Sequence, residues 1–107
     1  QHLRDQIPNY VVDFRRSIYS GEQAQKFYGA RGLISIVSST LIFDTVPTYF
    51  FDSLEILTDV QKQDASLEAL ISQALSDFWS VHDSNLLKEV SEMLAPYRES
   101  MQPSYFC

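Results

Sequence analysis

The sequence predicts an all-α protein with a compact array of about five antiparallel helices, and three observations lead to this fold class. Apolar residues recur at intervals of three and four along most of the chain, which is the period of an amphipathic helix. Proline, glycine and cap-forming residues separate these apolar stretches. Only one segment is rich in β-branched residues, and an isolated strand would leave its backbone groups without partners.

The length of 107 residues allows one hydrophobic core but not two. We therefore predict a single helical domain over residues 1–96 and a C-terminal tail over residues 97–107. The one cysteine, Cys107, excludes an intramolecular disulfide and favours an intracellular location, cytoplasmic or nuclear. Because the sequence begins at Gln1 without an apolar leader, we expect it to be a piece of a longer or processed chain.

The first predicted helix covers residues 8–20, where Pro8 suits a first turn that needs no N–H donor. Its apolar positions are Ile7, Val11, Phe14 and Ile18. Ser20 and Gln23 have the spacing of a capping box, which predicts that a second helix begins directly after the break. The apolar positions of this second helix are Phe27, Ala30, Ile34, Val37 and Leu41. Gly29 and Gly32 weaken it, so we expect a kink there.

Residues 33–51 form the most apolar stretch of the chain, with Asp44 as its one formal charge. Pro47 disfavours helical geometry at the residue before it, so the stretch is too interrupted for a bilayer span. We predict the end of one buried helix and the start of another, with Thr45 as cap. This third helix, over 47–62, has two apolar faces and should lie centrally.

Asp64 is a suitable cap for a fourth helix over residues 65–81, which has the clearest helical period in the chain. Its apolar stripe consists of Leu67, Leu70, Ile71, Ala74, Leu75, Phe78 and Trp79. A last helix, capped by Asp83 or Ser84, ends at Pro96. Its inward positions are Leu86, Leu87, Val90, Met93 and Leu94.

Two arrangements of these helices remain open, a closed bundle and a stack of helix pairs. The segment from Arg31 to Leu57, with its apolar run, its Asp44–Pro47 turn and its second apolar helix, resembles the paired helices of HEAT-type repeats. The resemblance covers one helix pair, and it implies HEAT-like stacked helix pairs as the alternative to a bundle.

The net charge of −6 is unevenly distributed, with five basic and three acidic residues in 1–31 but three basic and eleven acidic residues in 32–107. This balance makes nucleic acid an improbable main partner. The basic residues of the first third are candidates for contact with an anion or an acidic peptide: Arg15, Arg16, Lys26 and Arg31. The alternative is scattered surface charge.

No spacing of residues points to catalysis, a metal or a cofactor, so we expect none of them. His82 reads as a helix-end residue. Asp52, Glu55 and Asp59 on one helix could hold a cation or supply an acid–base pair, although a solvated acidic face explains them more simply.

We therefore predict a non-enzymatic protein–protein interaction module, such as a scaffold or adaptor segment of a larger assembly. It would bind a partner helix or a second copy through an apolar and aromatic face, for which the candidate residues are Tyr28, Leu33, Tyr49, Phe50 and Trp79. Trp79 equally suits the core. The alternative function is a regulatory helical domain that binds a small apolar ligand in its core.

Overall fold

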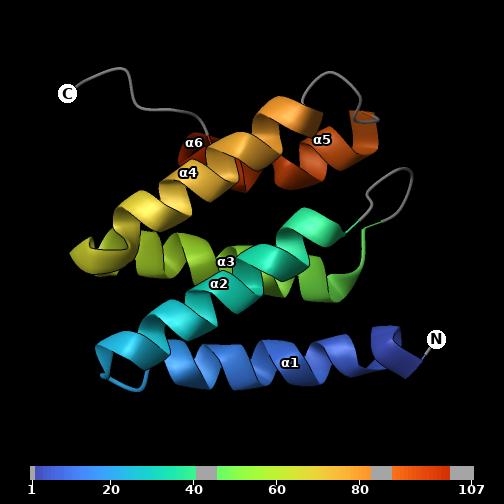
Figure 1. Ribbon diagram of the computed structural model, residues 1–107. Coiled ribbons are helices and arrows are strands. Elements are labelled where there is room, and N and C mark those ends of the chain that lie inside the picture. The colour runs from blue at the N-terminus through green and yellow to red at the C-terminus, as the bar shows by residue number, and fades with distance from the viewer. Residues whose placement is uncertain (1, 41–45, 83–87, 102–107) are drawn as a thin grey trace.

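The computed structural model describes residues 2–40, 46–82 and 88–101, with side chains from residue 5 onward, and confirms the all-α class (Figure 1). The helices in chain order are α1 (His2–Ile18), α2 (Gln23–Ser39), α3 (Thr48–Gln63), α4 (Ala65–His82), α5 (Lys88–Leu94), the 3₁₀ helix η2 (Ala95–Tyr97) and α6 (Arg98–Met101). The described residues contain no strand.

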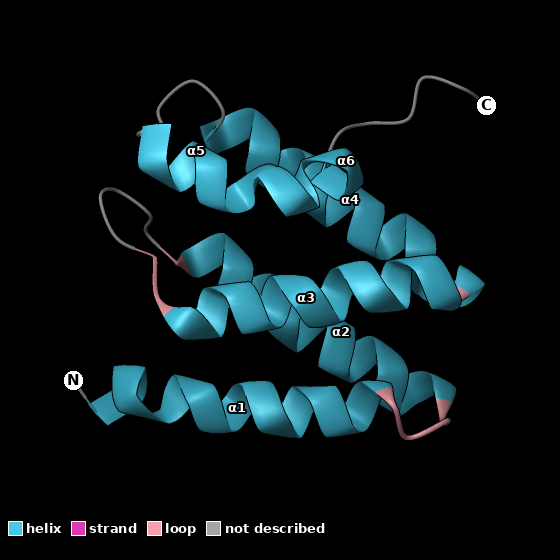
Figure 2. Cartoon of the chain, turned by 180° about the vertical axis from the view of Figure 1, so that it is seen from behind, coloured by secondary structure: helices cyan, strands magenta, loops and turns pink. Residues whose placement is uncertain are grey.

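The helices form two layers. Helices α2 and α4 run side by side in one layer, and α1, α3 and the α5–α6 segment form the other (Figures 1 and 2). The molecule is accordingly flat, with Cα extents of 44 × 39 × 18 Å. Helix α1 packs on α2 and α3 but forms no substantial pair with α4, although the first and fourth helices of a closed four-helix bundle are neighbours. The arrangement is therefore a stack of helix pairs.

Helix α3 occupies the centre of the core, as its two apolar faces predicted. It contacts α1, α2, α4 and η2, and its buried apolar residues are Phe50, Leu54, Ile56, Leu57 and Val60. Two buried hydroxyl groups of α3 donate to carbonyls of the same helix, Ser53 to Tyr49 at 2.8 Å and Thr58 to Leu54 at 2.9 Å. Burial of these polar groups is thus compensated by hydrogen bonds.

The first helix begins earlier than predicted. Pro8 lies inside α1 and not in its first turn, so one backbone hydrogen bond to the carbonyl four residues earlier is missing. Pro8 is exposed, which leaves its ring clear of the neighbouring helices, whereas Ile7 packs against the core. The apolar stripe therefore continues on both sides of the proline, and a rule based on proline alone placed the start of the helix too late.

The start of α2 also differs from the prediction. The Ser20 hydroxyl accepts from the Glu22 N–H at 3.3 Å, and the N-cap, Glu22, makes no side-chain capping bond. The Gln23 amide instead donates to Ser66 at 2.9 Å, so the predicted capping box is absent. Between the two helices, Gly21 has φ of +92°, a left-handed conformation that glycine adopts without strain.

The C-terminal segment is ordered further than predicted. Residues 98–101, which the sequence analysis assigned to the tail, form α6, and Met101 is fully buried against the rest of the core. Helix α6 packs on α4. Residues 102–107 lie outside the described residues, as do several positions of the predicted caps and stripes: Leu41, Thr45, Asp83, Ser84, Leu86 and Leu87.

The apolar stretch 33–51 is divided between α2 and α3, on either side of residues 41–45, which the structure does not describe. None of the helices described here has both the length and the apolar character that a bilayer crossing requires.

Candidate functional site

An apolar concave surface lies between the first two helices. It has a volume of about 470 Å³ and is open to solvent. Phe14 of α1 lines it together with five residues of α2: Ala24, Phe27, Tyr28, Arg31 and Gly32. We call this surface the α1–α2 hollow.

Two glycines of α2 create the close contact beneath the hollow. A Cβ atom at Gly29 would collide with the backbone oxygen of Phe14, and one at Gly32 would lie 2.5 Å from the Phe14 ring. Real Cβ atoms do not approach so closely, so a larger residue at position 29 would force the two backbones apart, and one at position 32 would displace the Phe14 ring. Helix α2 nevertheless continues from Gln23 to Ser39. The two glycines thus allow α1 to pack closely on α2. This close packing explains their presence without the predicted kink.

Three aromatic rings form a continuous strip along one edge of the hollow. The Phe14 ring meets the Tyr28 ring edge-on, with centroids 5.5 Å apart, and stacks on Tyr10 at 6.4 Å. Tyr28 is 61% exposed and Tyr10 is 44% exposed. Aromatic rings that remain this accessible are the side chains most often found as anchors in protein interfaces.

Arg31 supplies a positive charge in the lining of the hollow. Its guanidinium lies 5.7 Å from the centre of the Phe27 ring, and the residue is exposed. Among the described residues, no carboxylate forms an ion pair with it. The hollow therefore combines an apolar lining with one guanidinium group that is available to bind an anionic group.

The other three basic candidates do not gather around the hollow. Arg16 pairs with Asp13 at 3.5 Å, and the Arg15 guanidinium lies 5.3 Å from the centre of the Tyr19 ring. Lys26 binds Asp64 at 3.1 Å. The predicted group of four basic residues is thus distributed over separate contacts, and Arg31 alone reaches the hollow.

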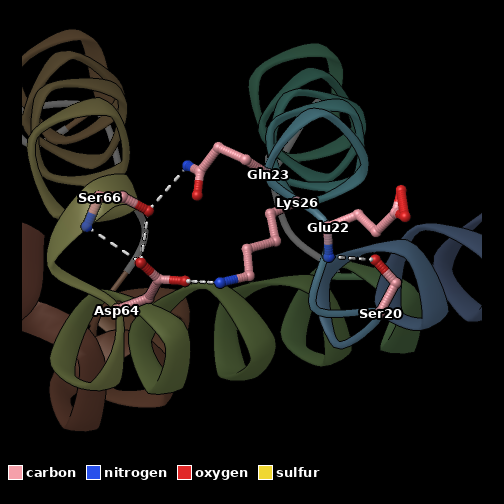
Figure 3. Close-up of polar contacts among 6 residues, drawn as sticks. All are labelled: Ser20, Glu22, Gln23, Lys26, Asp64 and Ser66. Atoms are coloured by element: carbon pink, nitrogen blue, oxygen red, sulfur yellow. Dashed lines mark hydrogen bonds and ion pairs between the residues drawn. The ribbon is translucent and has the colours of Figure 1, made fainter.

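The contact of Lys26 belongs to a polar cluster that joins α2 to the turn between α3 and α4 (Figure 3). Asp64 caps α4 as predicted, because it accepts from the Ser66 N–H at 3.0 Å and also from the Ser66 hydroxyl. These Ser66 bonds and the Lys26 ammonium lower the pKa of Asp64 below its usual value. A smaller open pocket of about 220 Å³ lies beside Lys26 and Asp64.

The acidic row on α3 is exposed and dispersed. The Tyr19 hydroxyl donates to Asp59 at 2.8 Å, and burial together with this carboxylate raises the pKa of Tyr19. Burial, followed by the charges of Glu55 and Asp52, raises the pKa of Tyr97. Within residues 2–40, 46–82 and 88–101, no group of three or more metal-ligating side chains has an arrangement suited to a metal ion. His82 ends α4, with its ring 4.5 Å from Phe78.

The five predicted partner-binding residues lie in different environments. Tyr28 is exposed at the hollow, whereas Leu33 and Phe50 are fully buried in the core and present no surface. Tyr49 and Trp79 are half-buried, and the Arg98 guanidinium covers the Trp79 ring at 5.1 Å. These residues do not form one surface.

The sequence did not indicate that Tyr10, Phe14 and Phe27 adjoin an open surface, because all three belong to helical apolar stripes, and Phe14 and Phe27 do pack partly against the core. The signal that could have found the hollow is the pair Gly29 and Gly32. Glycines three residues apart lie on one side of a helix and allow a neighbouring helix to come close.

No known protein family, curated protein or solved structure matches the chain.

Proposed function

We propose that this chain is a non-enzymatic protein–protein interaction module that binds its partner through the α1–α2 hollow. The observation that supports the proposal is the strip of Tyr10, Phe14 and Tyr28 beside an open apolar surface, in which both tyrosines are exposed and Phe14 is half-buried. Burying such rings against a partner releases water from apolar area and gives a rigid contact at low entropic cost.

The test is partner capture with variants of matched exposure. Tyr28→Asp places a charge in the hollow, and Val81→Asp places one on α4, where Val81 is 66% exposed. We expect a partner, identified from native extract and then purified, to bind the wild type and Val81→Asp with equal Kd. Binding to Tyr28→Asp should weaken at least tenfold, or by about 1.4 kcal/mol. Circular dichroism should show that both variants keep the fold.

Equal binding by Tyr28→Asp and the wild type would contradict the proposed site, even if the partner is genuine.

The alternative function, binding of a small apolar ligand in the core, requires an enclosed cavity. The two concave surfaces described above are both open to solvent, so neither favours that alternative.

A further inference from the structure

We infer that the partner of the α1–α2 hollow is an amphipathic helix of another protein that carries a carboxylate close to its anchoring apolar side chain. In this arrangement the apolar side chain enters the hollow and Arg31 binds the carboxylate. The inference rests on the proposed function and specifies the chemistry of the partner.

The positive charge of Arg31 at the hollow favours a partner with a negative charge. Arg31 is exposed, is held over Phe27, and pairs with no carboxylate in the described residues. Stacking on a ring orients a guanidinium while leaving its N–H donors free for a planar acceptor. A carboxylate satisfies two of these donors at once, which a neutral amide does less well.

The acidic character of the whole chain does not reverse this preference. Residues 1–31 carry five basic and three acidic residues, so the charge around the first helix pair is positive, and the excess acid follows residue 31. Screening limits the reach of distant charges to about 10 Å at 0.1 M salt. On α1, Asp13 pairs with Arg16, which reduces its repulsion of an incoming acid.

The shape of the hollow favours a helix as the binding element. It is bounded by two packed helices and is lined by Phe14, Phe27 and Tyr28. An amphipathic helix binds such a groove through side chains spaced by three or four residues, which places an acid one turn from an apolar anchor. The volume of about 470 Å³ leaves room for a large apolar side chain.

The experiment uses three synthetic helical peptides that share one leucine-rich face and differ at a single position one turn from the central leucine. That position is Glu, Gln or Lys. Titration into ¹⁵N-labelled protein should shift the amide signals of Phe27, Tyr28 and Arg31. We expect the Glu peptide to bind about two- to tenfold more tightly than the Gln peptide, and the Lys peptide to bind most weakly.

Two variants separate the role of Arg31 from general electrostatic attraction. Arg31→Gln should abolish the difference between the Glu and Gln peptides, whereas Arg15→Gln removes the same charge outside the hollow and should preserve the difference. A preference that survives Arg31→Gln, or equal binding of all three peptides, would overturn the inference while leaving the hollow as a protein-binding site.

Two further results would also overturn the inference. One is that no peptide shifts the signals of the hollow, in which case the partner-capture experiment still judges the proposed function independently. The other is self-association of the protein that Tyr28→Asp abolishes, measured by sedimentation equilibrium. That result would identify a second copy as the occupant.

Discussion

Gly32 leaves room for the Phe14 ring against α2 because it has no side chain. Helix propensity alone favours Gly32→Ala by about 1 kcal/mol. The added methyl group would lie 2.5 Å from the Phe14 ring, however, so the ring would have to leave its present contacts with Tyr10 and Tyr28. We therefore expect Gly32→Ala to lower the free energy of unfolding by about 1–3 kcal/mol, measured by urea denaturation.

Ser35→Ala provides the matched control for this prediction. Ser35 is an exposed residue of the same helix, so its replacement by alanine should be neutral or slightly stabilising. A Gly32→Ala variant as stable as Ser35→Ala would show that α1 and α2 can separate without cost.

Single residues were predictable where burial follows from periodicity alone. Val37, Leu54 and Leu75 are core residues, as their helical spacing indicates. The spacing could not decide which aromatic residues remain accessible, because Phe50 and Phe14 occupy equivalent stripe positions. Their difference arises from the packing partners, since α3 is covered on several sides and α1 is a terminal helix.

At the scale of elements, α6 depends on a single buried anchor. Met101 is fully buried, whereas Met93 on α5 is 51% exposed. We expect Met101→Ala to reduce the free energy of unfolding by about 2–4 kcal/mol through the cavity that it leaves. Met93→Ala should change it by less than about 0.5 kcal/mol. Chemical denaturation of both variants tests the contrast, and similar losses would mean that α6 contributes little to the core.

The ion pair between Lys26 and Asp64 joins two helix pairs, and its contribution depends on pH. Because the native pKa of Asp64 is lowered, the stabilisation is complete above the usual carboxyl pKa, near 4, and is lost as the pH falls through the native value. Asp64→Asn preserves the cap while removing the charge. We expect it to lower the urea midpoint at pH 6 and to approach the wild type at pH 3.

Asp13→Asn is the control for the ion pair, since Asp13 and Arg16 are mostly exposed and their pair should be worth little. A constant difference between wild type and Asp64→Asn at pH 6 and pH 3 would mean that the loss comes from something other than charge. High salt should also reduce the difference at pH 6.

The prediction of elements succeeded where the apolar period is long and failed at the start of α1 and for the short α6. The bounds of α3 and α4 agree with the prediction to within one residue, because Pro47 marks the start of α3 and Asp64 marks the start of α4. Helix α6 has four residues, too few for a period to be visible. Its helical form depends on the burial of Met101, which is a property of the assembled core.

For the whole molecule, the stacked arrangement predicts unequal local stability. Helix α3 has neighbours on several sides, whereas α1, among the described helices, packs mainly on α2 and α3. In stacked architectures each unit is stabilised mainly by its neighbours, so a terminal helix should open at lower free energy than a central one. We expect native-state hydrogen exchange to show higher opening free energies for Leu57 and Val60 amides than for Val11 and Phe14 amides.

Equal opening free energies in α1 and α3 would indicate a fully cooperative core and would contradict this expectation. The distinction between stack and bundle was not predictable from the sequence. Both arrangements require amphipathic helices with short connections, and the choice depends on whether α1 and α4 meet. That contact is determined by crossing angles, which follow from side-chain shapes such as that of Phe14 over Gly32.

The contact between Phe14 and Gly32 also limits which substitutions the two positions can accept during evolution. A larger residue at position 32 fits the present packing only with a smaller residue at position 14, so we expect the two positions to co-vary in related chains. Gly32→Ala combined with Phe14→Leu should accordingly recover stability that Gly32→Ala alone loses. Since Phe14 also lines the hollow, the same exchange would alter the surface offered to a partner, and divergence of the core would change binding specificity.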